Sequence, residues 1–564
     1  MADFKPRTTP GVYVTELSDF PASLAGVATA IPVFIGYTET ASVCGKPAFF
    51  KPILINSLAD YQKYFGAGYQ PHYLIAEASA TAPTDVSAWT WVDGEFQQVN
   101  YRLSKEGPPP VLASFNLYNS VRLFYENGGG TCYVVSAGAY KDAVDPKTGG
   151  ISINPAKLTQ GLTAAGEQAG PTITVIPDAV LLEGSVPTGK RMPISGDFQT
   201  LVRAMLTQCG TLQDRVALLD VFGTEAIDTA DKAQLDLDLA ECIGNFQTAV
   251  GETNLSYGAA YFPFLNTSVI PPSEVDYTVF NANADTLALL QSILLSQAAY
   301  LYPGTDPAKA GPALDDNPIF LAVAGYIAAI ATTLAPNNTP AERAAVKQLN
   351  GNLVNAVPLL RQMETVVAYE MSLLPASGAM AGIYALNDST RGVWNAPANM
   401  VVQQVIMPSV PVNTEQQGPI NVPINGKSVN VIRDFTGRGA VVWGARTQDG
   451  NSNDYRYIQV RRTLIYIESS IKLALQPFVF AANDGQTWVA VTAMVSGFLQ
   501  NLWAQGGLMG DKASDAFTVQ CGLGSTMTGQ DILNGYMIVQ VTLQMVRPAE
   551  FIELTFKQKM QGAA

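Results

Sequence analysis

FNLYNSVRLFYENGGGTCYVV, residues 115–135, contains the pattern that decides the fold. Residues 115–126 repeat apolar side chains at helical spacing, and the glycines that follow Asn127 predict the end of that helix. Residues 131–135 are a short, continuous apolar run, which is typical of a strand buried on both faces. The stretch therefore predicts a helix that leads directly into a central strand of a covered sheet.

The same alternation extends along the chain in both directions. Further buried strands are predicted at residues 31–36, 172–176 and 216–221, and further helices at residues 58–65, 198–209 and 228–250. Strands that alternate with helices favour a mainly parallel sheet with helices on its faces. We therefore expect a mixed α/β (α+β) fold.

Several segments depart from this pattern. Residues 67–113 are rich in Pro, Ser, Thr and Trp and predict a surface insertion, whereas residues 277–302 and 317–374 are rich in Ala and Leu and predict helices. Residues 319–335 are apolar and uncharged but short for a bilayer, so they predict a buried helix. Asn425-Gly426 predicts the turn of a hairpin over residues 418–435.

The C-terminal part predicts two helices followed by two strands. Residues 455–476 are amphipathic and stop at Pro477, and residues 487–505 form the second helical pattern. Residues 536–546 and 550–557 alternate apolar and polar side chains with the period of a half-buried strand. The first of these strands places on one face Met537, Val539, Val541 and Leu543.

The composition excludes several classes of function. Charged residues make up only 14% of the chain, against about 25% in an ordinary globular protein. The net charge of −14 argues against a general nucleic-acid binder, and a single histidine, His72, excludes His-rich metal centres. The five cysteines include no CxxC pair and predict reduced, buried thiols. We expect no metal and no cofactor.

We predict no catalytic residues. The glycines at 128–130 precede a strand, whereas a phosphate-binding loop must precede a helix. Gly426-Lys427-Ser428 resembles the end of a Walker A motif but has Asn421 where the motif needs glycine. Pairs of carboxylates such as Asp315-Asp316 keep a carbohydrate-active enzyme open as an alternative, because one sequence cannot show whether two carboxylates meet in a cleft.

Charge is distributed unevenly along the chain. Residues 431–480 carry a net charge of +3 and the remainder carries −17. The helical pattern in this segment contains Arg461, Arg462 and Lys472. Two interpretations stay open: a solvated helix face, or a basic strip that meets an acidic partner.

Motifs in order along nearly the whole chain resemble the tail sheath family of contractile phage tails and contractile injection systems. They are residues 9–17 (TPGVYVTEL), 25–36 (AGVATAIPVFIG), 127–135 (NGGGTCYVV), 214–220 (DRVALLD), 256–265, 392–398 (GVWNAPA), 430–446, 457–478 and 547–552 (RPAEFI). Residues 127–140 resemble most the sheaths of injection particles of the antifeeding-prophage and virulence-cassette type. Residues 67–113 and 277–374 match least.

The resemblance implies a multi-domain subunit. It implies an N-terminal intersubunit arm at residues 1–21, an α/β sheath domain at 22–275 and a helix-rich outer insertion at 276–376. It implies further a C-terminal core domain at 377–546 that packs with residues 22–40, and a C-terminal intersubunit arm at 547–564. Neighbouring subunits exchange the arms, which bend at residues 18–21 and 547–548 and complete β-sheets by strand addition.

The resemblance also implies which residues pair. The N-terminal arm would pair through Gly11, Val12, Tyr13, Val14 and Thr15. The C-terminal arm would pair through Glu550, Phe551, Ile552, Glu553, Leu554 and Phe556. The receiving strand is the one with Met537, Val539, Val541 and Leu543, and the candidate residues for the inner tube are Arg461, Arg462 and Lys472.

The implied function is mechanical. Copies of the chain would stack as helical rings around an inner tube, with baseplate and terminal cap proteins as partners, and contraction would drive the tube through an envelope. Sheath paralogues stay open as further partners. We expect no nucleic acid and no direct membrane insertion. The N-terminus lacks the apolar core of a signal peptide, which predicts assembly in the bacterial cytoplasm and leaves open release on lysis. Two alternatives to a sheath subunit stay open: the carbohydrate-active enzyme named above, and a surface adhesion protein. An adhesion protein would need an export signal.

Overall fold

The computed structural model describes residues 26–79, 84–105, 114–144, 151–304, 311–312, 316–334 and 339–554. The chain divides into two compact units. The larger unit comprises Ala28–Ile465 and Pro548–Ala564, and the smaller unit comprises Met1–Val27 and Tyr466–Arg547. Helix α12 (Ile458–Leu475) passes from the larger unit to the smaller one.

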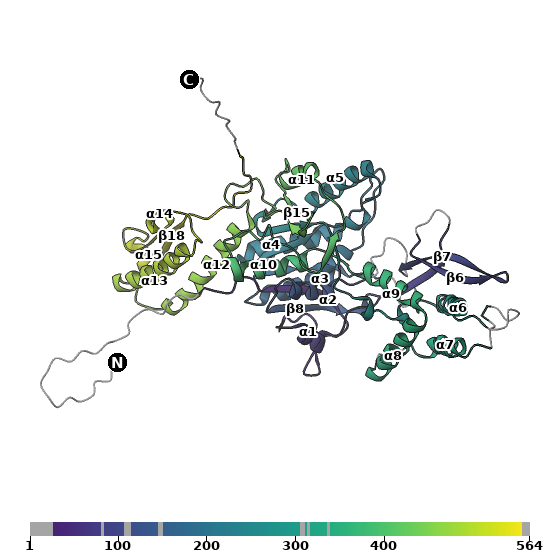
Figure 1. Ribbon diagram of the computed structural model, residues 1–564. Coiled ribbons are helices and arrows are strands. Elements are labelled where there is room, and N and C mark those ends of the chain that lie inside the picture. The colour runs from purple at the N-terminus through teal and green to yellow at the C-terminus, as the bar shows by residue number, and fades with distance from the viewer. Residues whose placement is uncertain are drawn as a thin grey trace, which may run out of the picture. The chain divides into compact units, whose positions relative to one another are not determined.

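An eight-stranded sheet forms the centre of the larger unit (Figure 1), in the order β16-β15-β11-β10-β9-β1-β8-β4. The six strands from β15 to β8 are parallel, and the edge strands β16 and β4 are antiparallel to their neighbours. The strands are β1 (Pro32–Thr38), β4 (Ile53–Ile55), β8 (Cys132–Ala139), β9 (Ile173–Val175), β10 (Val216–Asp220), β11 (Gly258–Phe262), β15 (Val429–Phe435) and β16 (Gly439–Val442). The predicted mixed α/β fold with a mainly parallel sheet is confirmed.

Strand β1 shows why these strands are apolar throughout. All seven of its residues are buried, and successive side chains point to opposite faces. Phe34 contacts Phe124 of α2 with 5.4 Å between ring centroids. Ile35 lies against Gly161 of α3, where an added Cβ would come within 2.7 Å of its Cγ2. The sheet is thus covered on both faces, as a parallel sheet requires.

Four of the helices that surround this sheet, α1, α2, α4 and α5, agree with the predicted periodicities, whereas α3, α10 and α11 were not predicted. Helix α2 extends over Leu117–Glu126, and α10 packs so closely on it that a Cβ on Gly382 would lie 2.6 Å from the Phe124 carbonyl oxygen. These helices are α1 (Leu58–Phe65), α2, α3 (Pro155–Glu167), α4 (Gly196–Leu212), α5 (Lys232–Ala249), α10 (Ser377–Arg391) and α11 (Thr414–Asn421). The larger unit also contains two small sheets. One pairs β2 (Ser42–Val43) with β3 (Lys46–Pro47), and the other has the order β13 (Leu373–Leu374), β12 (Leu265–Thr267), β14 (Val405–Pro408).

A second apolar core joins the two segments that match the family least. Strands from residues 73–105 form an antiparallel sheet in the order β5-β7-β6, which packs on helices from residues 284–371. Trp89 stacks on Tyr300 with 4.7 Å between ring centroids. The elements are β5 (Tyr73–Glu77), β6 (Val86–Val92), β7 (Glu95–Lys105), α6 (Ala284–Leu301), α7 (Pro318–Ala329), α8 (Pro340–Ala356) and α9 (Pro358–Met371). The sequence did not reveal that these segments share one core.

The smaller unit contains the second predicted helix and a two-stranded sheet. Helix α13 begins after an N-cap at Asp484, whose carboxylate accepts a hydrogen bond from the backbone of Thr487 at 3.0 Å. Its elements besides the end of α12 are α13 (Gly485–Ala504), α14 (Ala513–Ala516), β17 (Phe517–Cys521), α15 (Gly529–Leu533) and β18 (Val539–Leu543).

Three local predictions are wrong. The hairpin at 418–435 does not form: Asn413 and Gln416 form a capping box that starts α11, and β15 pairs instead with β11 and β16. The apolar helix α7 is buried on one side only, since Ile319 is 57% exposed. Cys44 is exposed and Cys521 is half-buried, whereas both were predicted to be buried.

Two buried carboxylates at the ends of central strands bind helix N-termini. Asp178, just after β9, accepts hydrogen bonds from the backbone amides of Asn116 and Leu117 at the start of α2. Asp220, the last residue of β10, accepts from the backbone amide of Ser377 at 2.8 Å and from its hydroxyl. Burial raises the pKa of Asp178 to about 6 and that of Asp220 to about 7, although these hydrogen bonds oppose the rise. The carboxyl ends of these strands, where open α/β sheets bind ligands, are therefore occupied by the chain's own helices.

Replacement of Asp220 by Asn should change how stability depends on pH. In the unfolded chain this carboxyl ionises near pH 4, whereas in the folded chain it holds its proton to about pH 7. The free energy of unfolding that this carboxyl contributes is therefore fully present below pH 4. It is lost as the pH rises from 4 to 7, by at most roughly 1.4 kcal/mol per pH unit. The amide of Asn does not titrate, so the free energy of unfolding of Asp220→Asn relative to the native protein should rise over this range.

Urea unfolding of the unassembled subunit at pH 5, 6 and 7.5 would measure this difference. Asp93→Asn is the matched control, because Asp93 lies exposed in the turn between β6 and β7. A constant difference between native protein and Asp220→Asn across the three pH values would contradict the assignment.

Candidate assembly interface

The sheet of the smaller unit has one half-buried face and one exposed face. Strands β17 and β18 are antiparallel, with Val519 opposite Val541. The side chains of Val539, Val541 and Leu543 are half-buried, whereas Gln540 and Thr542 are exposed. Three of the four predicted receiving residues thus share one face of β18, and Met537 lies two residues before the strand.

Both outer edges of this sheet lack a partner strand within the described residues. Exposed edges carry unpaired backbone donors and acceptors and pair readily with an added strand. Beside β17 a groove opens toward α13, lined in part by Trp488, Val489 and Val519. Val489 is 70% exposed there. The smaller unit therefore presents backbone edges and apolar surface that its described residues leave uncovered.

The described residues include part of the predicted C-terminal arm but none of the pairing residues of the N-terminal arm. Residues 11–15 and Phe556 lie outside the described residues. In the C-terminal arm, Phe551, Ile552 and Leu554 are 74%, 79% and 74% exposed, and Glu553 is exposed as well. Residues 550–554 form no strand in the single chain. Their alternating pattern therefore stays a prediction for the assembled state.

The predicted basic strip separates into two buried arginines and one exposed lysine. Arg461 is 7% exposed, and its guanidinium lies between the rings of Tyr257 and Tyr455, at 4.3 and 3.7 Å from their centroids. Arg462 is 4% exposed and forms an ion pair with Asp388, with 2.9 Å between Nη1 and Oδ1. Both guanidinium groups act inside the subunit, so we do not carry them forward as tube contacts. Lys472 is exposed on α12.

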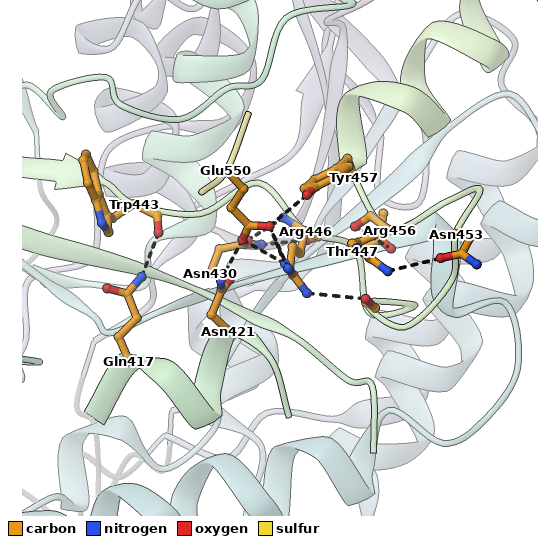
Figure 2. A network of polar contacts seen from close by, with 11 residues as sticks. Gln417, Asn421, Asn430, Trp443, Arg446, Thr447, Asn453, Arg456, Tyr457 and Glu550 are labelled. Carbon is orange, nitrogen blue, oxygen red and sulfur yellow. Dashed lines mark hydrogen bonds and ion pairs between the residues drawn. The ribbon is translucent and has the colours of Figure 1, made fainter. Parts of the chain in front are cut away.

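The first residue of the C-terminal arm's predicted pairing segment, Glu550, is held in a partly buried polar network of the larger unit (Figure 2). Arg446 Nε lies 2.9 Å from Glu550 Oε1, and Arg446 Nη2 lies 2.6 Å from Oε2. Asn421 Nδ2 donates to Oε1 at 2.7 Å, and the Tyr457 hydroxyl donates to Oε2 at 2.8 Å. We call Arg446, Asn421 and Tyr457 the carboxylate cradle.

The cradle keeps the Glu550 carboxylate ionised. Burial disfavours the charge, but hydrogen bonds from Arg446, Asn421 and Tyr457 outweigh it and hold the pKa of this carboxyl below its usual value. Sequence reasoning found Glu550 as part of the arm but missed its partner. Arg446 lies 104 residues earlier in the chain, and no local pattern connects the two.

Within the described part of the chain, no group of three or more His, Cys, Asp and Glu side chains could hold a metal ion. Among the helices described, none combines the length and the apolar character needed to cross a membrane.

The known proteins that this chain resembles are tail sheath proteins. The family model for the phage tail sheath C-terminal domain matches residues 451–559. The tail sheath protein of Burkholderia phage BcepMu is 28% identical over 202 residues, which are 34% of this chain and 42% of the phage protein. The chain therefore matches less than half of the length of that relative.

Solved structures extend the likeness to the full length. The contracted helical sheath of the anti-feeding prophage is 25% identical, with a TM-score of 0.53 over 98% of this chain and 100% of that one. A chain of the anti-feeding prophage baseplate structure gives the same identity, TM-score and coverage. The contracted PVC sheath complex, an extracellular contractile injection system, shares the fold at 24% identity and a TM-score of 0.51 over 99% of both chains. The sequence motifs, the C-terminal match and the shared full-length fold agree: residues 451–559 match the phage tail sheath C-terminal domain, and the chain resembles contractile sheath proteins over its full length.

Proposed function

We propose that the chain is the structural subunit of a contractile sheath, which polymerises as stacked helical rings around an inner tube and contracts to drive that tube through a target envelope. The full-length likeness to the contracted anti-feeding prophage sheath is the observation that carries the proposal. The partners are further copies of the chain, an inner tube protein, and baseplate and terminal cap proteins. Assembly takes place in the bacterial cytoplasm, and the particle acts outside the cell after release.

Strand addition links the copies. The N-terminal pairing residues 11–15 and the C-terminal pairing residues 551–556 of neighbours would extend the sheet formed by β17 and β18, while Glu550 stays bound to the cradle of its own subunit. The unpartnered edges of that sheet and the exposed side chains of Phe551, Ile552 and Leu554 support this arrangement. About four backbone hydrogen bonds per added strand, at about 1 kcal/mol each, would keep neighbours attached while whole subunits move.

Contraction would draw its free energy from apolar surface that becomes buried between subunits. The smaller unit has exposed apolar side chains of this kind: Phe480 is fully exposed and Leu533 is 81% exposed. Because the energy is stored in the assembled lattice, firing needs no nucleotide.

Electron microscopy of the purified protein tests the proposal directly. A sheath subunit should form rings or hollow striated tubes at high protein concentration. A discrete small oligomer under all conditions, with no polymer in the presence of the tube protein, would refute the proposal.

Deletion of residues 1–17 should abolish tubes without unfolding the subunit. The deletion removes the pairing residues 11–15, while the sheet and cores of the described chain remain complete. Circular dichroism and the melting temperature should match those of the full chain, and negative-stain images should show no tubes. Deletion of residues 2–8, which spares the pairing residues, is the control and should assemble normally.

Lys472→Glu should weaken assembly on the inner tube if α12 faces an acidic tube surface. The ammonium group is exposed, so its replacement leaves the fold unchanged and reverses one charge at the contact. Co-expression with the tube protein should yield fewer extended sheaths than the native chain does. Lys512→Glu changes another exposed lysine of the smaller unit and serves as the control. Equal yields from both variants would remove Lys472 from the tube interface.

A further inference from the structure

We propose that the carboxylate cradle fixes the root of the C-terminal arm on its own subunit, so that the arm bends after Glu550 and not at Arg547-Pro548. What the arm does beyond that point rests on the proposed function, but the attachment itself does not. The cradle thus contains positioning residues for strand exchange, and the partner that the free part of the arm meets is a second copy of this chain.

The cradle is organised before Glu550 enters it. Asn430 in β15 is fully buried and accepts a hydrogen bond from the Arg446 backbone amide at 2.7 Å. Asn430 also donates to the Arg446 carbonyl at 2.8 Å, so the backbone of Arg446 is fixed from both sides (Figure 2). The side chain of Arg446 is only 3% exposed. Without Glu550, a buried cation would lose its counter-charge, and the site therefore strongly favours occupation by a carboxylate.

The geometry selects a carboxylate at one place on the arm. The guanidinium fork of Arg446 contacts both oxygens of Glu550, while Asn421 and Tyr457 donate to one oxygen each. An amide in this position would present its NH₂ group to donors, and an ammonium would be repelled. Glu553 provides the internal comparison, because it is exposed on the same segment.

Exposure changes abruptly after the attachment point. The side chain of Glu550 is 19% exposed, whereas the apolar side chains of Phe551 and Ile552 are 74% and 79% exposed. The held part of the arm therefore ends at residue 550 and the presented part begins at residue 551. Side chains of a strand alternate between faces, so a slip of one residue would turn Ile552 and Leu554 away from a receiving sheet. A fixed residue 550 sets which side chains reach the neighbour.

Limited chymotrypsin digestion of the unassembled subunit tests the attachment. A protease needs several residues of extended, mobile chain around the bond it cleaves, and Phe551 follows the attached residue directly. Cleavage after Phe551, followed by mass spectrometry, should be at least tenfold faster in Glu550→Gln than in the native chain. Glu553→Gln should cleave at the native rate.

Arg446→Lys and Asn421→Ala change the cradle without changing the cleaved sequence. Both should also accelerate cleavage after Phe551, and Asn421→Ala keeps the test available if Arg446→Lys does not fold. A variant counts as folded when its melting temperature matches that of the native chain. Native cleavage rates in Glu550→Gln and in a folded cradle variant would overturn the attachment.

Assembly tests the positioning role separately. At the concentration where half of the native subunits are in tubes, Glu550→Gln should yield at least tenfold less polymer, and Glu553→Gln should match the native chain. Fast cleavage together with normal tubes would overturn the positioning role. If the native chain forms no tubes at all, the proposed function fails, while the digestion result still decides the attachment.

Discussion

A parallel strand must be covered on both faces, and the structure of the larger unit depends on this constraint. Strand β1 meets it with Phe34 against α2 and Ile35 against α3. The carboxylates of Asp178 and Asp220 accept hydrogen bonds from the first backbone amides of the covering helices α2 and α10. In many α/β proteins such strand ends bind a ligand. In this chain they bind the covering helices, which gives a scaffold with little room for chemistry at that edge.

The low charge content has a similar structural meaning. Only 14% of the residues are charged, and four arginines are then buried inside the folded subunit, at 1–7% exposure: Arg215, Arg446, Arg461 and Arg462. Three of the seven basic residues in the segment 431–480, Arg446, Arg461 and Arg462, are thus buried inside the fold. A surface with few charges packs against copies of itself with less desolvation cost, which suits a subunit of a dense polymer.

Sequence periodicity predicted most of the central sheet and could not predict the rest. Continuous apolar runs located β1, β8, β9 and β10 within a few residues. Strand β15 was assigned to a hairpin because Asn425-Gly426 is a strong local turn signal, whereas its parallel partner β11 lies about 170 residues earlier. For the same reason, no pattern could connect Glu550 with Arg446, or residues 73–105 with the helices that complete their core. Local signals fix elements, and long-range packing selects their partners.

In the arrangement that we propose, a polar attachment and an alternating apolar segment have separate roles in the C-terminal arm. Apolar side chains gain free energy in proportion to buried area, and an alternating apolar pattern does not by itself distinguish registers that differ by two residues. A carboxylate in a buried guanidinium fork binds in one geometry, because every donor must find its oxygen. If Phe551, Ile552 and Leu554 were used to hold the arm on its own subunit, they would be lost to the neighbour. An ionic attachment at Glu550 leaves these three side chains available and defines their position, so specificity within the subunit and adhesion between subunits come from different residues.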